Sequence, residues 1–370
     1  MPASMKCRLS MRRWRPRPRG GSPAARLEAF FWRIWLGKGP ISLALLPLSW
    51  IYGAMGRLVK SLYALKILPA AHLDVPVLAV GNLTVGGSGK TPFCIWLAQS
   101  LAHEGWKVGV VCRAMAPLAG RPKKVALDDN PLVVGDEALL LAQKTLLPVY
   151  AGRSKSKAAM ALAACEDVDM ILVDDGLQHH ALKKDIEIAI IDGERRFGNG
   201  FLLPAGPLRE SKRRLKRVDI RVCQGKAKEG EYAMTVLPGV FYNVLDSQKL
   251  RRPSDFQGER ITAMAGIALP ERFFALLSRL GLRFKTMAFE DHHVYTPEDL
   301  DVPGAVIMTE KDAVKVRHFA HTRVWALSVV TVMDPAVLDA VIERLMKEKR
   351  NQARIAKPDG LEQHHGQRQG

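Results

Sequence analysis

The chain has 370 residues, long enough for two domains with hydrophobic cores of their own, and its 48% hydrophobic and 25% charged residues are typical of a globular protein. Its net charge of +18 lies mainly at the start, because residues 1–60 hold 12 Lys and Arg against one acid. Charge confined to one terminus, without an aromatic-studded RNA-binding motif, argues against nucleic acid as the partner. The five cysteines are scattered without metal-ligand spacing, as expected of reduced thiols in a cytosolic chain.

The N-terminal region is predicted to contact a membrane. Residues 1–38 form a basic arm, expected to be disordered because its first part is rich in Arg, Pro, Gly and Ser. Residues 39–60 are predicted to form an apolar, membrane-associated helix, since residues 39–56 carry no charge. Pro40 and Pro47 suit a tilted or interfacial helix, whereas the length also permits a span, so both arrangements stay open.

Two further features favour a membrane surface over a helix buried against a globular core. Anionic lipid would attract the basic arm. Tryptophan favours the headgroup layer, and three tryptophans lie near or within the apolar run: Trp32, Trp35 and Trp50. A secretory signal peptide fits poorly, because no small-residue cleavage site follows the run.

Residues 61–235 alternate between strand and helix patterns, which predicts a parallel sheet covered by helices. Short apolar runs mark the expected strands at residues 76–80, 107–112, 147–150, 170–173 and 186–191. A glycine-rich turn and then a helical pattern over residues 91–105 follow the first run. The predicted fold is therefore an α/β domain of the P-loop NTPase type.

The pattern restarts and predicts a second, smaller α/β domain over residues 236–346. Its expected elements are strands at residues 261–265, 305–308 and 324–330 and a helix over residues 272–280. Residues 347–370 are polar and are expected to form a loose tail.

The turn at residues 81–91 reads GNLTVGGSGKT, close to the phosphate-binding pattern GxxxxGK[ST], although Thr84 stands at the first glycine position. The residues expected to bind the nucleotide are Gly86, Gly87, Ser88, Gly89, Lys90 and Thr91. The glycines let backbone N–H groups turn toward one anion, Lys90 is expected to reach the β- and γ-phosphates, and Thr91 to ligate Mg²⁺. A turn that merely joins strand to helix is the alternative. The segment TEKD at residues 309–312 has the wrong spacing for a guanine-reading motif, so we expect ATP.

Two carboxylates, Asp174 and Asp175, follow the strand expected at residues 170–173. A carboxylate at a strand end beside a phosphate loop is where Mg²⁺ coordination is expected. Asp also caps helices, but two adjacent acids exceed what a cap needs. The sequence therefore predicts that at least one of them binds Mg²⁺ and leaves open which.

A series of segments extends beyond the phosphate loop in a defined order: GNLTVGGSGKTP, VGDE at 134–137, AGR at 151–153, DDGLQH at 174–179, GNGFLLPAGPLRE at 198–210, AGIALPERFF at 265–274, DHHVY at 291–295 and TEKDAVK at 309–315. Over about residues 40–345 the chain thereby resembles the tetraacyldisaccharide 4'-kinases, the lipid A 4'-kinases of Gram-negative bacteria. The resemblance implies ATP- and Mg²⁺-dependent phosphorylation of the 4'-hydroxyl of a tetraacylated glucosamine disaccharide 1-phosphate. It also implies a place at the cytoplasmic face of the inner membrane, whose anionic surface would be a partner.

The resemblance further implies roles for particular residues. Catalysis in the family is attributed to an Asp–His pair, which corresponds here to Asp136 and His292. Lys90 is the third residue expected to be catalytic, through its contact with the phosphates. The residues expected to bind the substrate are Arg113, Glu137, Arg153, Gln178, His179, Arg209 and Glu210. A carboxylate such as Asp136 can accept the proton of a sugar hydroxyl, and guanidinium groups grip phosphate oxygens in pairs. Without the resemblance, Asp136 could equally be a helix cap and His292 an ordinary histidine.

Two stretches qualify this picture. The family usually has SRGYG after the second strand, whereas residues 112–116 read CRAMA, so Arg113 is kept but both glycines and the tyrosine are lost. The shape of this loop is therefore not predicted. The basic run KRRLKR at residues 212–217 is expected to face anionic lipid, with a solvated helix face as the alternative.

Two other functions are alternatives to the lipid kinase. A membrane-bound P-loop ATPase that switches a protein partner would share Lys90, Thr91 and Asp174, but would not need Asp136 or His292. A soluble small-molecule kinase would not need the apolar N-terminal region. Nothing in the sequence indicates an oligomeric state.

Overall fold

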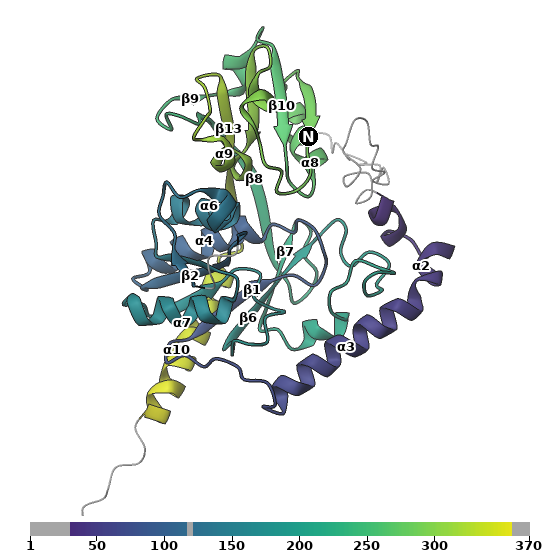
Figure 1. The fold of residues 1–370 in the computed structure, drawn as a ribbon, viewed down its shortest axis with the longest axis vertical. Coiled ribbons are helices and arrows are strands. Elements are labelled where there is room, and N and C mark those ends of the chain that lie inside the picture. The colour runs from purple at the N-terminus through teal and green to yellow at the C-terminus, as the bar shows by residue number, and fades with distance from the viewer. Residues whose placement is uncertain (1–29, 117–120, 357–370) are drawn as a thin grey trace, which may run out of the picture.

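The structure is a computed structural model that describes residues 30–116 and 121–356. Its strands are β1 (Val77–Gly81), β2 (Val108–Arg113), β3 (Lys123–Lys124), β4 (Val149–Gly152), β5 (Met170–Val173), β6 (Ile186–Asp192), β7 (Ile220–Gln224), β8 (Tyr232–Asn243), β9 (Leu250–Arg251), β10 (Ile261–Ala265), β11 (Lys285–Ala288), β12 (Ala305–Thr309) and β13 (Val324–Met333). They form one sheet in the order β11-β10-β12-β13-β8-β7-β6-β1-β5-β2-β4-β3, with β9 beside β8 (Figure 1). Paired strands are parallel except at β3–β4, β8–β9 and β8–β13.

Helices cover both faces of the lower part of this sheet. The helices are α2 (Pro40–Ala44), α3 (Leu46–Ala64), α4 (Lys90–His103), α5 (Pro131–Val134), α6 (Asp136–Thr145), α7 (Lys155–Cys165), α8 (Pro270–Arg279), α9 (Glu310–Val316) and α10 (Ala336–Ala356), with 3₁₀ turns η1 (Lys212–Lys216), η2 (Pro253–Phe256) and η3 (Pro297–Leu300). Because successive strand residues point to opposite faces, Leu78 and Val80 pack with α4, α6 and α10, whereas Val77 packs with α7. The predicted α/β fold with a mainly parallel, helix-covered sheet is confirmed.

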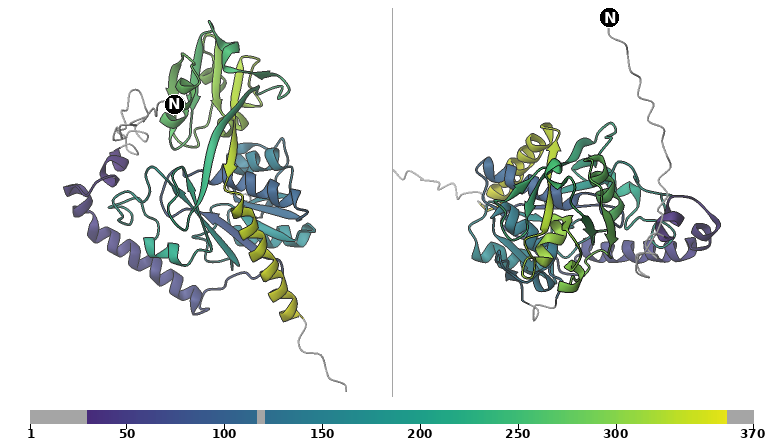
Figure 2. Two further views of the ribbon diagram at one scale, coloured as in Figure 1. Left: turned by 180° about the vertical axis from the view of Figure 1, so that it is seen from behind. Right: turned by 90° about the horizontal axis from the view of Figure 1, so that it is seen from above.

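β8 and β13 connect the lower and upper parts of the molecule, since both strands pass through the junction between them (Figures 1 and 2). The upper part has hydrophobic clusters of its own, one around Phe241 and one around Met308. Sequence analysis did not identify β8, because Pro238 and Gly239 in its middle usually interrupt strands. The proposed domain boundary at residues 235/236 falls within this strand, and the division into domains stays a prediction.

Most of the other predicted elements are found within a few residues of their expected bounds. The strands expected at residues 170–173 and 261–265 coincide with β5 and β10. The loose tail expected from residue 347 is wrong for residues 347–356, which continue α10. The rest of that tail lies outside the described residues.

The apolar N-terminal segment is helical but divided. The helix expected at residues 39–60 is found as α2 and α3, which meet at Leu45. Within the described residues, no helix is both long and apolar enough to cross a membrane. In the view from above in Figure 2, the purple helices α2 and α3 project beyond the rest of the molecule on one side. Large apolar side chains of α3 are exposed there: Leu48, Trp50, Ile51, Met55 and Leu58.

Two parts of the membrane prediction need correction. The prediction that Trp32 and Trp35 lie in the headgroup layer is wrong, because both are buried against the protein, and of the three tryptophans only Trp50 is exposed. In the basic run at residues 212–217, Arg214 is buried in an ion pair with Glu187 and does not face outward. Most of the basic arm, residues 1–29, lies outside the described residues.

Candidate active site

The phosphate loop leads from β1 into α4, as the sequence predicts. Gly86 and Gly89 have φ values of +86° and +85°, in the left-handed region that favours glycine. The buried side chain of Asn82 supports the loop from within, since its Nδ2 donates to Gly86 O at 3.3 Å and to Ser88 Oγ at 3.0 Å. Thr91 is the second residue of α4, at the end of the helix where the dipole is positive. The loop therefore has the backbone shape that an anion site needs.

Asp174 and Asp175 directly follow β5 and lie against the phosphate loop. Lys90 Nζ lies 3.5 Å from Asp175 Oδ1, and Arg209 Nη1 lies 3.0 Å from Asp175 Oδ2. Burial opposes ionisation of Asp175, but these two cations prevail and lower its pKa to about 2. Burial, followed by the charge of Glu137, raises the pKa of Asp174 to about 6. The two neighbouring carboxylates therefore differ in character.

Lys155 fixes the shape of this acidic turn. Its side chain is buried at the start of α7, and its Nζ donates at 2.7 Å to the backbone carbonyls of both Asp174 and Asp175. Asp175 has a φ of +47°, a conformation that residues with a Cβ rarely adopt unless their surroundings hold them there. Sequence analysis did not identify Lys155, although it lies two residues after the predicted Arg153.

The predicted Mg²⁺ ligands Thr91, Asp174 and Asp175 offer hydroxyl and carboxylate oxygens, the donors that this ion prefers. Among the described residues, no group of three or more His, Cys, Asp or Glu side chains is placed to hold a metal by itself. Mg²⁺ in kinases is usually held by one or two carboxylates together with phosphate oxygens. The donor set therefore fits an ion that a nucleotide helps to bind.

Asp136 and His292 are brought into contact although 156 residues separate them. His292 Nδ1 lies 2.9 Å from Asp136 Oδ2 and 3.1 Å from Oδ1. This hydrogen bond raises the pKa of His292. Burial opposes the ionised form of Asp136, but His292 and then Lys311 lower its pKa to about 2. Asp136 is not a helix cap, since Gly135 occupies that position before α6.

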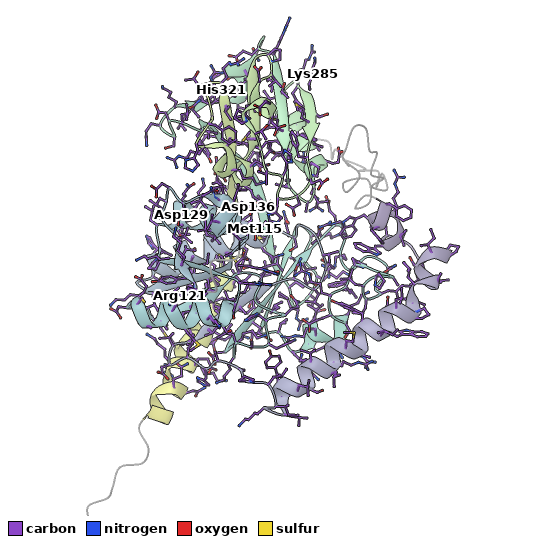
Figure 3. All side chains as sticks on the ribbon, viewed as in Figure 1. Met115, Arg121, Asp129, Asp136, Lys285 and His321 are labelled. Atoms are coloured by element: carbon purple, nitrogen blue, oxygen red, sulfur yellow. The ribbon has the colours of Figure 1, made fainter. Side chains whose placement is uncertain are left out.

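A cavity of about 420 Å³ opens beside this pair, where the upper and lower parts of the molecule meet (Figure 3 labels Asp136 and Met115 there). The lining residues are Arg113, Met115, Gly135, Asp136, Glu137, Arg153, Lys155, Asp174, Asp175, Gln178, His179, Arg209 and His292. The cavity thus gathers the predicted substrate residues except Glu210, whose Oε1 accepts a hydrogen bond from Gln178 at 3.0 Å. The phosphate-loop residues do not line it, but Lys90 contacts Asp175 in its wall. Met115 stands where the family usually has tyrosine.

His179 is neutral in this site. Its Nε2 accepts a hydrogen bond from the backbone N–H of Ser156 at 3.2 Å. Burial and the neighbouring charge of Lys155 lower its pKa to about 4. His179 therefore offers a polar contact without a charge at neutral pH.

Lysines of α9 reach the Asp–His pair from the other side. Lys311 Nζ lies 3.2 Å from Glu137 Oε1 and 3.3 Å from Asp291 Oδ1. Lys315 Nζ lies 3.6 Å from Asp136 Oδ2. The TEKDAVK segment is part of the family resemblance, but neither the resemblance nor the local pattern predicts that these lysines lie beside Asp136.

A second charged cluster joins the phosphate loop to the N-terminal segment. Arg195 Nε lies 2.7 Å from Asp192 Oδ2, and its Nη2 donates to the loop carbonyl of Gly87. The ring of Trp32 lies 4.2 Å from the Arg195 guanidinium, a cation–π contact. Arg272 at the start of α8 reaches the same carboxylate at 3.0 Å. Sequence analysis assigned none of these contacts.

Comparison with known proteins agrees with this geometry. The family model described as tetraacyldisaccharide-1-P 4'-kinase matches residues 41–347. A tetraacyldisaccharide 4'-kinase of Methylobacillus flagellatus is 42% identical over 319 residues, which cover 85% of this chain and 95% of that protein. The corresponding proteins of Shewanella amazonensis and Shewanella pealeana are 40% and 42% identical, over 86% and 87% of this chain and 96% and 100% of theirs.

A solved structure shares the fold. It is that of the "apo" form of LpxK from Aquifex aeolicus in complex with ATP, with a TM-score of 0.68 at 24% identity, over 82% of this chain and 99% of that one. The shares of this chain that match by sequence and by fold are thus similar. The chain belongs to the tetraacyldisaccharide-1-P 4'-kinase family.

Proposed function

We propose that this kinase transfers the γ-phosphoryl group of ATP to the 4'-hydroxyl of a tetraacylated disaccharide 1-phosphate, a step in lipid A synthesis. The observation that supports this best is the contact between Asp136 and His292 at the wall of a cavity that also contains Arg153 and Arg209. A protein switch that only hydrolyses ATP has no second substrate and needs no arginine-lined cavity for an acceptor beside such a pair.

In the proposed mechanism, the acceptor hydroxyl enters the cavity beside Asp136. A sugar hydroxyl is a weak nucleophile, and transfer of its proton to a positioned base accelerates such reactions by about 10²–10⁴-fold. Asp136 is ionised at neutral pH because its pKa is about 2, and His292 orients it through the hydrogen bond at 2.9 Å. The proton of the hydroxyl passes to this pair as the oxygen attacks the γ-phosphorus.

The phosphate end of the reaction falls to other residues. Lys90 and the loop N–H groups are proposed to hold the β- and γ-phosphates and to neutralise charge as it moves to the leaving group. Thr91 with Asp174 or Asp175 would hold Mg²⁺, which supplies further charge neutralisation. Arg113, Arg153 and Arg209 are proposed to bind phosphate oxygens of the substrates, for which guanidinium is suited.

We also propose that the protein works at the cytoplasmic face of the inner membrane. A tetraacylated substrate leaves the bilayer only at great cost, about 0.8 kcal/mol for each CH₂ group exposed. The apolar side chains that α3 exposes, Trp50 among them, provide a surface that can enter the headgroup layer. The basic residues of the N-terminal arm would strengthen this contact with anionic lipid.

The test is incubation with ATP, Mg²⁺ and tetraacyldisaccharide 1-phosphate, followed by mass spectrometry. We expect one added phosphate, placed at the 4'-position by fragmentation. Lys90→Ala should remove this product while the circular dichroism spectrum stays native, because the charge at the phosphates is lost. Lys107→Ala, which breaks the exposed pair with Asp167, is the matched control and should keep full activity. ATP turnover that ignores the lipid and responds to a protein partner would contradict the proposal.

A further inference from the structure

Helices α6 and α9 lie against each other, and at each end of the pair an acidic residue of one helix is close to a lysine of the other. The first turn of α6 carries Asp136 and Glu137, and its last turn carries Lys144. Lys144 is paired with Glu310 at the start of α9, whereas Lys315, near the end of α9, approaches Asp136. The two helices therefore run in opposite directions, and their charges also suit the dipole of α6.

The pairs at the Asp136 end differ from a surface salt bridge. The side chains of Lys311 and Lys315 are only 17% and 6% exposed. Lys311 Nζ lies between Glu137, Asp291 and Asp136, at 3.2, 3.3 and 3.9 Å from their oxygens. Lys315 Nζ lies 3.6 Å from Asp136 Oδ2. Charge pairs removed from water in this way interact more strongly than exposed ones.

Among the described residues, Glu137, Arg113, Arg153 and Lys155 line the same cavity as the Asp–His pair, and other charged groups are paired directly with it. Asp136 faces His292, Lys311 and Lys315. His292 faces Asp136, Asp291 and Lys311. Both members of the pair thus have a lysine beside them, and a positive charge opposes the binding of a proton to either one.

We propose that Lys311 and Lys315 are positioning residues that hold Asp136 as a carboxylate and keep the Asp136–His292 pair able to accept the proton of the acceptor hydroxyl. This role rests on the proposed kinase function. A base must be free of its proton at the working pH. Burial of Asp136 and its hydrogen bond to His292 both favour a proton on the pair, whereas the charge of a neighbouring lysine opposes it. The lysines come from the upper part of the molecule and Asp136 from the lower part, so the base is complete only when the two parts are in contact.

The alternative is that the lysines only fasten α9 to α6. The same helix pair contains the control, because Lys144 and Glu310 join the two helices without touching Asp136. A fastening role predicts the same effects when Lys144 or Lys311 loses its charge. A positioning role predicts that only Lys311 and Lys315 affect proton binding.

The experiment compares Lys311→Met and Lys311→Arg with Lys144→Met. NMR titration of the His292 ring without nucleotide, its signal identified by its absence in His292→Ala, reports the pKa independently of activity. We expect Lys311→Met to raise the pKa of His292 by about one, and to move the acid limb of the kcat profile to higher pH, with about tenfold lower kcat on that limb. Lys311→Arg should restore both. Lys144→Met should lower stability and change neither.

The possible results separate the two ideas. An unchanged His292 titration and an unchanged acid limb in folded Lys311→Met overturn the positioning role. Equal changes in Lys144→Met overturn it as well, in favour of fastening. Lys315→Met leaves Asp312 buried without its ion pair and is useful only if it folds, so Lys311→Met is the deciding variant. If the wild-type protein does not phosphorylate the lipid, the proposed function is overturned. If it does, but the pKa of His292 is the same in Lys311→Met as in the wild type, only this inference is overturned.

Discussion

Asp136 is in contact with charged and polar groups from several parts of the chain. It accepts a hydrogen bond from His292 and faces lysines of α9, while its Oδ1 accepts the backbone N–H of Glu137 at 2.8 Å. Each of these groups favours its ionised form over the neutral form. A residue that looks like a helix cap in isolation is therefore the meeting point of the proposed acid–base chemistry.

Asp136→Asn and His292→Ala should each lower kcat by about 10²-fold or more, and the double variant should be little worse than the more severe single one, because residues that share one proton transfer act as a unit. In Asp136→Asn the pKa of His292 should fall, since a neutral amide replaces the carboxylate that accepts its hydrogen bond and favours the protonated ring. Steady-state kinetics of the four proteins and an NMR titration of His292 measure both effects. Losses that multiply in the double variant would show that the two residues act separately.

The sequence predicted this site unevenly. The phosphate loop could be predicted from its glycine and GKT spacing, because its backbone shape depends on neighbouring residues such as Asn82 and Ser88. Asp136 and His292 are far apart in the chain, and only the family resemblance joined them. Lys155 and Lys311 were missed because lysine is common on surfaces, and nothing in their local pattern distinguishes a buried lysine from an exposed one.

At the scale of elements, α3 presents two different sides. Its buried Ser49 hydrogen bonds to Leu202 O and accepts from Ala205 N, which fixes the helix to the loop before Pro207. Trp50 and Met55 are 67% and 62% exposed on the other side. An exposed apolar surface of this kind usually marks a contact with a membrane or a protein. The sequence predicted the apolar segment but not which side faces outward.

Trp50→Glu combined with Met55→Glu should reduce flotation with anionic vesicles, because two charges would have to enter the headgroup boundary. Lysine and arginine contacts weaken with salt and apolar contacts do not, so the remaining binding should be more sensitive to salt than that of the wild type. Leu250→Glu, a similarly exposed position on the far strand β9, is the control and should float as the wild type does. Wild-type protein that stays unbound at low and high salt would rule out a lipid contact for α3.

At the scale of the whole molecule, one sheet passes through two sets of hydrophobic clusters. Phe93 belongs to the cluster of the lower part and Phe241 to one in the upper part, and both side chains are fully buried. The paired strands β8 and β13 run through both parts, whereas each part has hydrophobic clusters of its own. The sequence predicted two domains from the restart of the pattern, whereas the long-range pairing of β8 with β13 is not encoded in either strand alone.

Phe241→Ala should cost about 3–5 kcal/mol of stability, as expected for removal of a buried aromatic ring. If the parts unfold separately, as separate cores predict, hydrogen exchange should accelerate in β10, β12 and β13 while β1 and β5 stay protected. Phe93→Ala should give the reverse pattern. Equal acceleration in both parts with either variant would show a single cooperative unit.

The contacts that run from Trp32 through Arg195 to Gly87 connect the segment preceding α2 with the loop that is proposed to bind ATP. Equilibria that share an element obey reciprocity: if attachment of the adjoining helix α3 to lipid changes the affinity for ATP by some factor, ATP changes the affinity for lipid by the same factor. In that case the fraction of protein bound to the bilayer would depend on the fraction that holds nucleotide. The concentration of ATP in the cell would then help to set how much of the enzyme is found where its insoluble substrate lies.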